Sequence, residues 1–579
     1  MAVEKNNEII EEEARVTEEV QEQPEGLPID VSVEGEEMVE EKPQDDFNAN
    51  LAEDMDERTL QSMASDLIAE YKKDKNSRKE WEEAYIKGLE LLGTKYQEVT
   101  KPFKGASGVT HPLLAESVTQ FQAQAYKELI PSDGPVRTKV VGLQSPQIEA
   151  QADRVKEYMN FLLMEEMEEY TTDMDQMLFY LPLSGSTFKK IYYDAMLGRP
   201  CSKFIPAEDL VVPYYASDLK DCERITHIIK MTENEVTKKM AGGFYRDIEL
   251  ASPRETTDQV QQKVNELQGV KRTESDMLHT ILEMHVDLNL EDYEDFDDKA
   301  KKIKIPYIVT IDEGSGEILS IYRNYKPNDI SYARIEYFVH YKFLPGLGFY
   351  GFGLTHMIGG LSRAATQSLR QLIDAGTLKN LPAGFKSRGI RVRDDDQPIQ
   401  PGEFRDVDAP GGNIRDQFFN LPFTEPSTTL FQLLGFVVQA GQKFAAITDS
   451  NIGNDTQNRA VGTTIALMER GSRVMSGVHK RCYYAMRLEF KILAKICAES
   501  LPPEYPYDVY GGPRQIKQSD FDERVDILPV ADPNIMSMAQ RVTLAQTQLQ
   551  IAQTNPQIHN IHEAYRRVYE ALGTKQIEG

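Results

Sequence analysis

The stretch that decides the fold is Tyr341 to Arg393, which reads YKFLPGLGFYGFGLTHMIGGLSRAATQSLRQLIDAGTLKNLPAGFKSRGIRVR. It opens with a turn rich in glycine and aromatic residues, Pro345 to Gly353. Apolar residues then recur at intervals of three and four, which is the spacing of a helix with one buried face. The pattern predicts an amphipathic helix from Leu354 to about Asn380, roughly 40 Å long. The helix should end before Pro382, because a residue that precedes proline avoids the helical region.

Three glycines, Gly359, Gly360 and Gly376, lie inside this predicted helix. Glycine in a helix interior costs roughly 0.5–1 kcal/mol relative to alanine. Two explanations remain open on sequence grounds. The glycines either allow a neighbouring backbone to approach closely or mark bends.

Composition sets the broad class of the protein. A chain of 579 residues with 40% hydrophobic and 27% charged residues is typical of a soluble globular protein and long enough for two to four domains. It contains no apolar run of transmembrane length, and its N-terminus lacks the apolar core of a signal peptide. Its four cysteines have no CxxC spacing, so we expect reduced, structural thiols in a cytosolic setting.

The net charge of −28 is unevenly distributed. Residues 1–46 contain 17 Asp/Glu and three Lys/Arg, which gives −14, half of the total. This segment is predicted to be a disordered acidic tail. The other −14 is spread over more than five hundred residues, so the chain lacks the basic balance expected of a protein that grips nucleic acid.

Hydrophobic periodicity predicts a helix-rich α+β fold. One polar stretch, Arg254 to Ser275, is expected to be mobile, and a β-rich centre is expected over Asp276 to Tyr341. Thr232 and Glu235 have the spacing of a capping box at the start of a short helix. The principal expected helices cover residues 56–98 (as one or two), 113–129, 147–183, 354–380, 430–444, 460–500, 536–553 and 557–571. The expected strands cover residues 137–143, 184–213 (as a hairpin), 225–231, 278–287, 304–310, 318–325, 337–343 and 524–529.

A direct search for enzyme signatures gives one match. Gly346-x-Gly348-x-x-Gly351 follows a predicted strand and precedes a helix, as a dinucleotide fingerprint does. Phe349 and Tyr350 are bulky where a pyrophosphate would lie, and no alternation of strands and helices surrounds the motif. The chain has no P-loop, HExxH motif or nucleophile elbow, and its histidines are scattered. The sequence therefore predicts no catalytic residue, no cofactor and no metal site.

Several segments, taken in order, resemble portal (head–tail connector) proteins of tailed bacteriophages, in particular the podophage type. The resemblance covers roughly Asp56 to Gly573 and depends on the order and spacing of its pieces. These are THPLLAESVTQFQAQAYKELIPSDGPVRTKV, LSGSTFKKIYYD with FIPAEDLVVPY, FLPGLGFYGFGLTHMIGGLSRAATQSLRQLIDAGTLKNLPAG, NRAVGTTIALMERGSRVMSGVHKRCYYAMRLEF and LPVADPNIMSMAQRVTLAQTQLQ.

The resemblance implies a ring, typically of twelve subunits, at one capsid vertex of the virion, assembled in the host cytoplasm. Double-stranded DNA would pass through it without sequence specificity. Its partners would be the terminase large subunit, tail adaptor or head-completion proteins, the major capsid protein and, as a further candidate, a scaffolding protein. No membrane, catalytic activity or cofactor is implied.

The family's wing, stem, clip and crown can be assigned to segments of this chain by the resemblance. After the tail (1–50), these are wing (51–275), a β-rich region of wing with clip as a candidate (276–345), stem-type helix (346–381), tunnel-type loop region (382–426), wing and crown helices (427–530) and C-terminal crown helices (531–579).

The densest basic cluster near the helix end gives the candidate site: Lys386, Arg388, Arg391 and Arg393. A channel for DNA should not bind its cargo tightly, because every neutralised phosphate adds affinity. We expect these four residues to form a DNA-channel loop that brakes or holds the duplex. Two alternatives stay open, another virion structural protein such as a tail adaptor, and a dinucleotide-binding enzyme that uses the glycine motif.

Overall fold

In a computed structural model, the chain divides into two units, 1–49 and 50–579, and the second unit contains all the helices and strands named here. The predicted acidic tail lies outside the described residues up to residue 46. The structure describes residues 47–93, 103, 105–132, 134–253, 258–269, 277–290, 303–327, 329, 331–380, 384–386, 391–392, 407–408, 418–420, 424–444, 461–509, 512–522, 524–531, 538–554 and 561–571.

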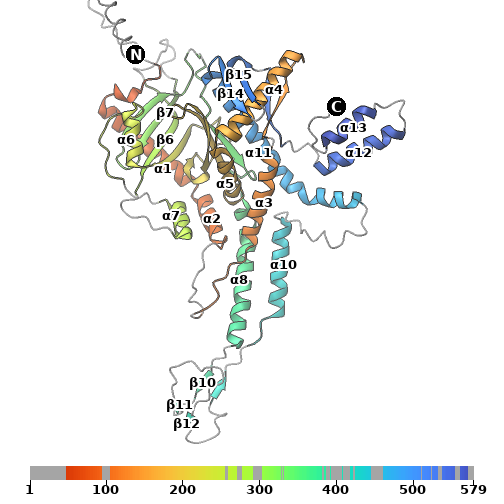
Figure 1. Cartoon of the computed structure of the whole chain (residues 1–579). Helices are drawn as coiled ribbons and strands as arrows, with labels where there is room; N and C mark the ends of the chain where they lie inside the picture. Colours follow the sequence, from red (N-terminus) through yellow and green to blue (C-terminus); the bar gives the residue numbers. More distant parts are fainter. Residues whose placement is uncertain are drawn as a thin grey trace, which may run out of the picture. The chain divides into compact units, whose positions relative to one another are not determined.

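The fold is mixed α and β and rich in helix, as predicted. Its largest described sheet has five antiparallel strands in the order β4-β5-β6-β7-β8. Two of them, β6 and β7, are labelled in Figure 1. The strands are β4 (Leu210–Val211), β5 (Arg224–Met231), β6 (His279–Leu288), β7 (Ile305–Asp312) and β8 (Ile318–Arg323). Three of them, β6, β7 and β8, lie within residues 276–341 and confirm the β-rich centre predicted there. The open edge of β8 is covered by Asn50, whose amide donates to the carbonyl of Leu319 at 3.2 Å and accepts from the N–H of Ile321 at 3.0 Å.

A second sheet has three antiparallel strands in the order β3-β2-β9. It consists of β2 (Ser186–Asp194), β3 (Arg199–Pro206) and β9 (Phe338–Lys342). The predicted hairpin is β2–β3. β9 comes directly before the glycine-rich turn, so this sheet fixes where the turn begins.

The N-terminal helices are α1 (Glu57–Ser77), α2 (Lys79–Glu90), α3 (Leu113–Leu129), α4 (Pro146–Phe161) and α5 (Glu169–Ser184). The continuous helical region expected over 147–183 is wrong in one respect. A π-helical turn, Leu162–Glu166, separates α4 from α5, and the chain leaves helical geometry at Met167. Leu162, Leu163 and Met167 are all buried, so the break keeps three apolar side chains in the core.

Two short helices test the local predictions. The capping box of Thr232 and Glu235 is present at the start of α6 (Glu233–Ala241). The mobile stretch predicted over 254–275 is wrong for its central part, which forms α7 (Gln259–Gln268), while residues 254–257 and 270–275 lie outside the described residues. The Val260 side chain of α7 is fully buried, and Lys263 forms an ion pair with Glu90 of α2 at 2.9 Å. These contacts order a segment whose polar composition favoured a loop.

The C-terminal half contains α8 (Leu354–Asn380), α10 (Thr428–Phe444), α11 (Val461–Ser500), α12 (Met538–Thr554) and α13 (Ile561–Ala571). It also has a hairpin that the sequence did not predict, β14 (Glu504–Val509) with β15 (Gly512–Lys517). β1 (Val136–Val140) pairs with β16 (Val525–Pro529), which joins distant parts of the chain. Among the described helices, none has the length and apolar character needed to cross a membrane.

Candidate functional site

The turn before α8 is built around two buried side chains, Arg78 and Tyr350. The Tyr350 hydroxyl donates to the carbonyl of Leu210 at 2.8 Å. The Arg78 guanidinium, which lies between α1 and α2, donates at 2.7–2.9 Å to the carbonyls of Ala207, Glu208 and Leu210 and to the Tyr350 hydroxyl. Buried polar groups need hydrogen-bond partners, and here Arg78 supplies them for both segments. Its hydrogen bonds therefore hold the turn against the start of the five-stranded sheet.

The glycines of the G-x-G-x-x-G motif are explained by packing within the turn. A Cβ on Gly346 would lie 2.0 Å from the Tyr350 carbonyl oxygen, and one on Gly351 would lie 2.4 Å from that of Gly185. A Cβ on Gly348 would lie 2.4 Å from the Tyr214 ring. The preceding strand, β9, is antiparallel to β2. The geometry therefore lacks the open loop after a parallel strand that a pyrophosphate requires.

The start of α8 is held by α2 and α5. The Thr355 hydroxyl donates to the Leu183 carbonyl at 2.6 Å, and a Cβ on Gly88 would lie 2.4 Å from Thr355 Cγ2. Trp81 stacks on Tyr350 with ring centroids 4.7 Å apart. Burial lowers the pKa of His356, beside Trp81, to about 4, so this imidazole is neutral at physiological pH.

A loop between α2 and α3 is tied along the polar side of α8. The N–H of Ser107 donates to Asp374 Oδ1 at 2.7 Å, and the N–H of His111 donates to the Thr366 hydroxyl at 3.1 Å. Arg370 donates to the carbonyls of Gly108 and Val109 at 3.1 and 2.8 Å. Two of the few charged side chains on α8, those of Arg370 and Asp374, are thus already engaged.

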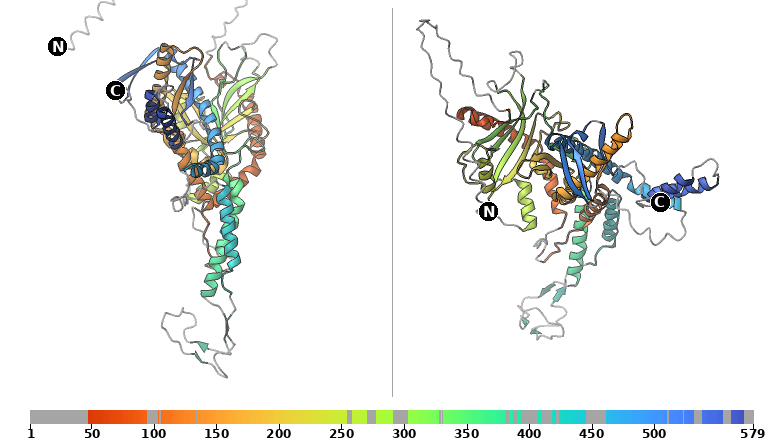
Figure 2. Two further views of the ribbon diagram at one scale, coloured as in Figure 1. Left: turned by 90° about the vertical axis from the view of Figure 1, so that its right-hand side faces the viewer. Right: turned by 45° about the horizontal axis from the view of Figure 1, so that its top comes forward.

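α8 and α10 lie side by side and run in opposite directions (Figure 1 and Figure 2). The end of α8 meets the start of α10, where Lys379 and Glu425 are 4.0 Å apart. The other end of α10 approaches α3, because a Cβ on Gly441 would lie 2.6 Å from Leu113. From residue 369 to its end, α8 has no buried side chain.

The three α8 glycines have no close neighbour among the residues that the structure describes. A Cβ on Gly359 or Gly376 would meet its nearest described atom at 3.8 or 4.0 Å, an ordinary contact, and one on Gly360 would meet nothing within 4 Å. The helix runs through all three positions without interruption. Close approach of another part of the same chain therefore does not explain them in the described residues.

α10 exposes an apolar surface that α8 does not cover. Its 17 residues include one charged side chain, Lys443. Phe431, Leu433 and Phe436 are 66%, 50% and 69% exposed. A helix that is apolar on most of its circumference is normally buried on most of it. These three side chains are spread around the part of the helix that α8 does not cover, and we call this exposed apolar part of α10 the α10 face.

The structure describes the predicted channel loop only in part. β10 (Gly384–Lys386) pairs with β13 (Phe418–Asn420), and β11 (Arg391–Val392) pairs with β12 (Val407–Asp408). Lys386 and Arg391 therefore lie on two different ribbons, with Arg391 in register with Asp408. Arg388 and Arg393 lie outside the described residues. The backbone pairing shows that the segment predicted as loop contains short strands.

A buried charge network joins α11 to all three strands of the second sheet. The carboxylate of Glu489 accepts from Lys189 of β2 at 3.1 Å, from Ser202 of β3 at 2.7 Å and from the Tyr341 hydroxyl of β9. The Lys189 ammonium lies 3.9 Å from the centre of the Tyr170 ring. The sequence did not predict this network, because its two charges are 300 positions apart. The local sequence provides no clear signal, because Lys189 is followed directly by a second lysine, Lys190, in a strand that also contains serine, threonine and aspartate.

The described residues hold no group of three or more His, Cys, Asp or Glu side chains placed to bind a metal. Cys201, Cys222, Cys482 and Cys497 are buried and unpaired. Burial raises the pKa of Cys482 and of Cys497 to about 12, which keeps both thiols protonated. Comparison with known proteins finds no family model and no curated protein that matches this chain.

Proposed function

We propose that this protein is a bacteriophage portal subunit, which closes into a ring through which double-stranded DNA is packaged and ejected. The observation that carries the proposal is the α10 face on a paired α8–α10 unit. The resemblance of the sequence segments supports it, and α8 (Leu354–Asn380) occupies most of the predicted stem-type span of 346–381, after the turn at its start.

The α10 face favours self-association through a contact between different surfaces of neighbouring copies. Burying apolar surface stabilises by about 25 cal/mol per Å², so three large, half- to two-thirds-exposed side chains favour a partner. On the solvent side of α8, a Cβ on Gly360 would meet nothing within 4 Å among the described residues, so this position leaves room for a large side chain of another copy. A contact between the α10 face of one copy and the α8 side of the next is heterologous, and heterologous contacts close into rings when the rotation fits.

The sparse charge of the helix pair suits a channel wall. α8 and α10 together carry Arg363, Arg370, Lys379, Lys443 and Asp374. Arg370 and Asp374 bind the 105–112 loop, so few cations remain to neutralise phosphates, and weak attraction lets a duplex move. We place Lys386, Arg388, Arg391 and Arg393 at the DNA, where they would act as a brake.

In this proposal the ring occupies one capsid vertex of the virion. It would contact the terminase large subunit during packaging and tail adaptor or head-completion proteins afterwards. The major capsid protein and a scaffolding protein would surround it during assembly.

Mass photometry and negative-stain microscopy of the purified protein test the ring. We expect particles of about twelve times the 65.8 kDa subunit mass, with a central opening of duplex width. Phe431→Ser combined with Phe436→Ser should shift the population toward monomers. The matched control is Met196→Ser with Leu197→Ser, two residues 80% and 54% exposed at the β2–β3 hairpin tip. A monomeric wild-type protein would refute the proposal.

Charge reversal of the four basic residues tests the role of the loop separately. Rings should still form, while packaging efficiency or DNA retention should fall. Unchanged packaging and retention would exclude the braking role. Rings that never take up DNA with a terminase would instead favour a tail adaptor.

A further inference from the structure

The outer side of α11 forms a basic and apolar stripe. Lys480, Tyr484, Leu488, Lys491 and Lys495 follow one another at helical spacing and are all exposed. Tyr484 is 50% and Leu488 45% exposed. The opposite side of the helix, including Cys482, Met486, Phe490 and Leu493, is buried in the core. We call the five exposed residues the α11 stripe.

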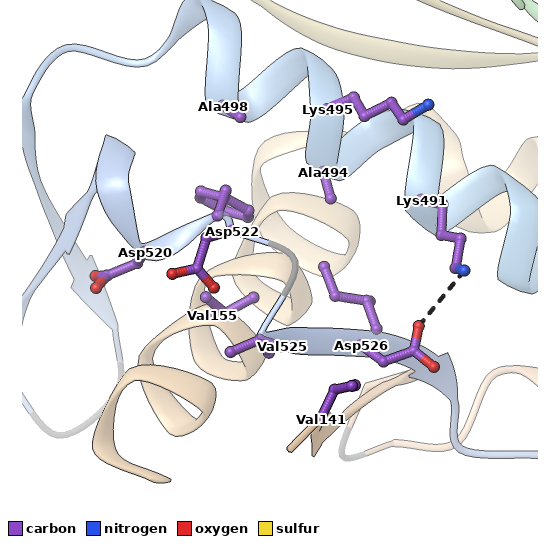
Figure 3. A pocket seen from close by; sticks show the side chains of 12 residues that line it. Val141, Val155, Lys491, Ala494, Lys495, Ala498, Asp520, Asp522, Val525 and Asp526 are labelled. Atoms are coloured by element: carbon purple, nitrogen blue, oxygen red, sulfur yellow. Dashed lines mark ion pairs between the residues drawn. The ribbon is translucent and has the colours of Figure 1, made fainter. Parts of the chain in front are cut away.

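A cavity of about 560 Å³ opens beside the C-terminal end of this stripe (Figure 3). α4, α11, β16 and the turn that precedes β16 form its walls. The apolar part of its lining consists of Val141, Val155, Ala494, Ala498, Phe521, Val525 and Ile527. Its volume is in the range of pockets that bind small molecules or anchor side chains.

The carboxylates around the cavity are already neutralised. Asp520 binds Arg154 at 2.6 Å, Asp522 binds Arg524 through Nε at 2.7 Å, and Asp526 binds Arg487 at 2.5 Å. Each aspartate therefore has its own arginine.

Two lysines at the same mouth are in surplus. Lys491 reaches Asp526, which Arg487 already neutralises, only at 3.7 Å, as the dashed line in Figure 3 shows. Lys495 has no ion-pair partner within the described part of the chain, and neither has Lys480 farther along the helix. The stripe is therefore positively charged on a protein whose net charge is −28.

We propose that the α11 stripe and the adjoining cavity form a docking surface for an acidic peptide segment of a partner protein. The segment inserts one large apolar side chain into the cavity and lays its carboxylates over Lys480, Lys491 and Lys495. Tyr484 and Leu488 cover its apolar edge. This inference goes beyond the proposed function and does not depend on ring formation.

The chemistry of the surface distinguishes a peptide from nucleic acid. A phosphate backbone would gain from the lysines, but it has no apolar group to place in the cavity and would leave the cavity unused. An acidic peptide with an apolar anchor uses both parts, because carboxylates pair with lysine ammonium groups and the buried side chain supplies the hydrophobic term.

Fluorescence anisotropy with the full chain tests the inference. The probe is a fluorescein-labelled peptide of glutamates with a single phenylalanine. Two comparison probes replace either the phenylalanine by glutamate or the glutamates by glutamine. We expect micromolar binding of the first probe, weakened by salt, and at least tenfold weaker binding of both comparison probes.

Variants then locate the site. Lys480→Glu with Lys495→Glu should weaken binding about tenfold, because two attractions become repulsions at exposed positions. Ala494→Phe should fill the cavity and weaken only the probe that carries phenylalanine. The matched control is Lys72→Glu with Lys73→Glu, two exposed residues of α1, which should leave binding unchanged.

Each other outcome overturns the proposal. These are absence of peptide binding, equal loss with the α1 control, insensitivity to Ala494→Phe, and binding of a labelled DNA duplex in place of the peptide. Binding of laurate that Ala494→Phe abolishes, without peptide binding, would identify the cavity as a lipid-anion site instead.

Discussion

Replacing Lys189 by methionine should destabilise the contact between α11 and the second sheet more than any surface substitution. The side chains of Lys189 and Glu489 are both fully buried, and their charged atoms are 3.1 Å apart. Removing the lysine leaves a buried carboxylate with hydrogen bonds from Ser202 and Tyr341 but with no counter-charge. Breaking one partner of a buried ion pair costs about 3–5 kcal/mol.

Native-state hydrogen exchange measures this loss of stability locally, at the amides of the elements that the ion pair joins. With 1.36 kcal/mol per factor of ten, a loss of 3–5 kcal/mol accelerates exchange roughly 150- to 5000-fold. We expect the acceleration at the amides of β2 and of α11 around Glu489. The combined variant Lys189→Met with Glu489→Gln should exchange more slowly than the sum of the single effects predicts, because it leaves no unpaired charge.

The control for this experiment is an exposed ion pair. Lys87 and Glu83 are 3.6 Å apart with side chains 68% and 47% exposed. Such pairs contribute about 0–1 kcal/mol, so Lys87→Met should accelerate exchange less than tenfold. If Lys189→Met has no larger effect than Lys87→Met, the network does not join the sheet to α11.

Three further predictions concern glycines of the turn and of α8, the buried Arg78, and the buried carboxyl of Glu208. Gly351→Ala should strongly lower the midpoint of thermal unfolding, because the new Cβ would lie 2.4 Å from the Gly185 carbonyl oxygen. Gly360→Ala has open space and should stabilise the isolated subunit by about 0.5–1 kcal/mol. Equal thermal midpoints for the two variants would contradict the packing of the turn. Arg78→Met should lower the free energy of unfolding in urea by about 2–6 kcal/mol, because the buried carbonyls of Ala207 and Glu208 lose the donor that Arg78 supplies, at about 1–3 kcal/mol for each unsatisfied group. Near-wild-type stability would show that water takes the place of the guanidinium. Burial and the nearby Asp209 raise the pKa of Glu208 from its ordinary 4.5 to about 8 in the folded protein. The folded state therefore holds this proton more tightly than the unfolded state, and the resulting stability is fully present below pH 4.5 and is lost as the pH rises through 8. Glu208→Gln, which stays neutral, should gain stability over the wild type as the pH rises, and a constant difference in thermal midpoint from pH 5 to pH 9 would contradict the assignment.

Local patterns predicted those elements whose cause is local. The bounds of α8 follow from the three- and four-residue spacing after Gly353 and from Pro382, and the capping box of Thr232 and Glu235 follows from two side chains three residues apart. The β2–β3 hairpin follows from alternation around a glycine turn. In each case the determining interactions lie within a few residues.

Elements whose cause is distant were missed. α7 has a polar sequence and forms where Val260 and Lys263 meet α2. The π-helical turn before Met167 allows α4 and α5 to pack their apolar sides into the same core. The apolar spacing within either helix gives no sign of this turn. The roles of Arg78 and Glu489 depend on partners more than a hundred positions away, which no periodicity can reveal.

By itself, the sequence determined the long amphipathic helix, its glycine-rich entry turn, the acidic excess and the helix-rich α+β class, because periodicity, turn residues and charge act over short distances. Only the tertiary structure decided that the motif glycines pack against their own chain, that α10 pairs with α8 and leaves Phe431 and Phe436 exposed, and that one buried carboxylate holds three strands to α11. Those features depend on which surfaces meet in three dimensions. Burial sets the free-energy cost of an unpaired charge or an exposed aromatic ring, and burial is a property of the folded chain.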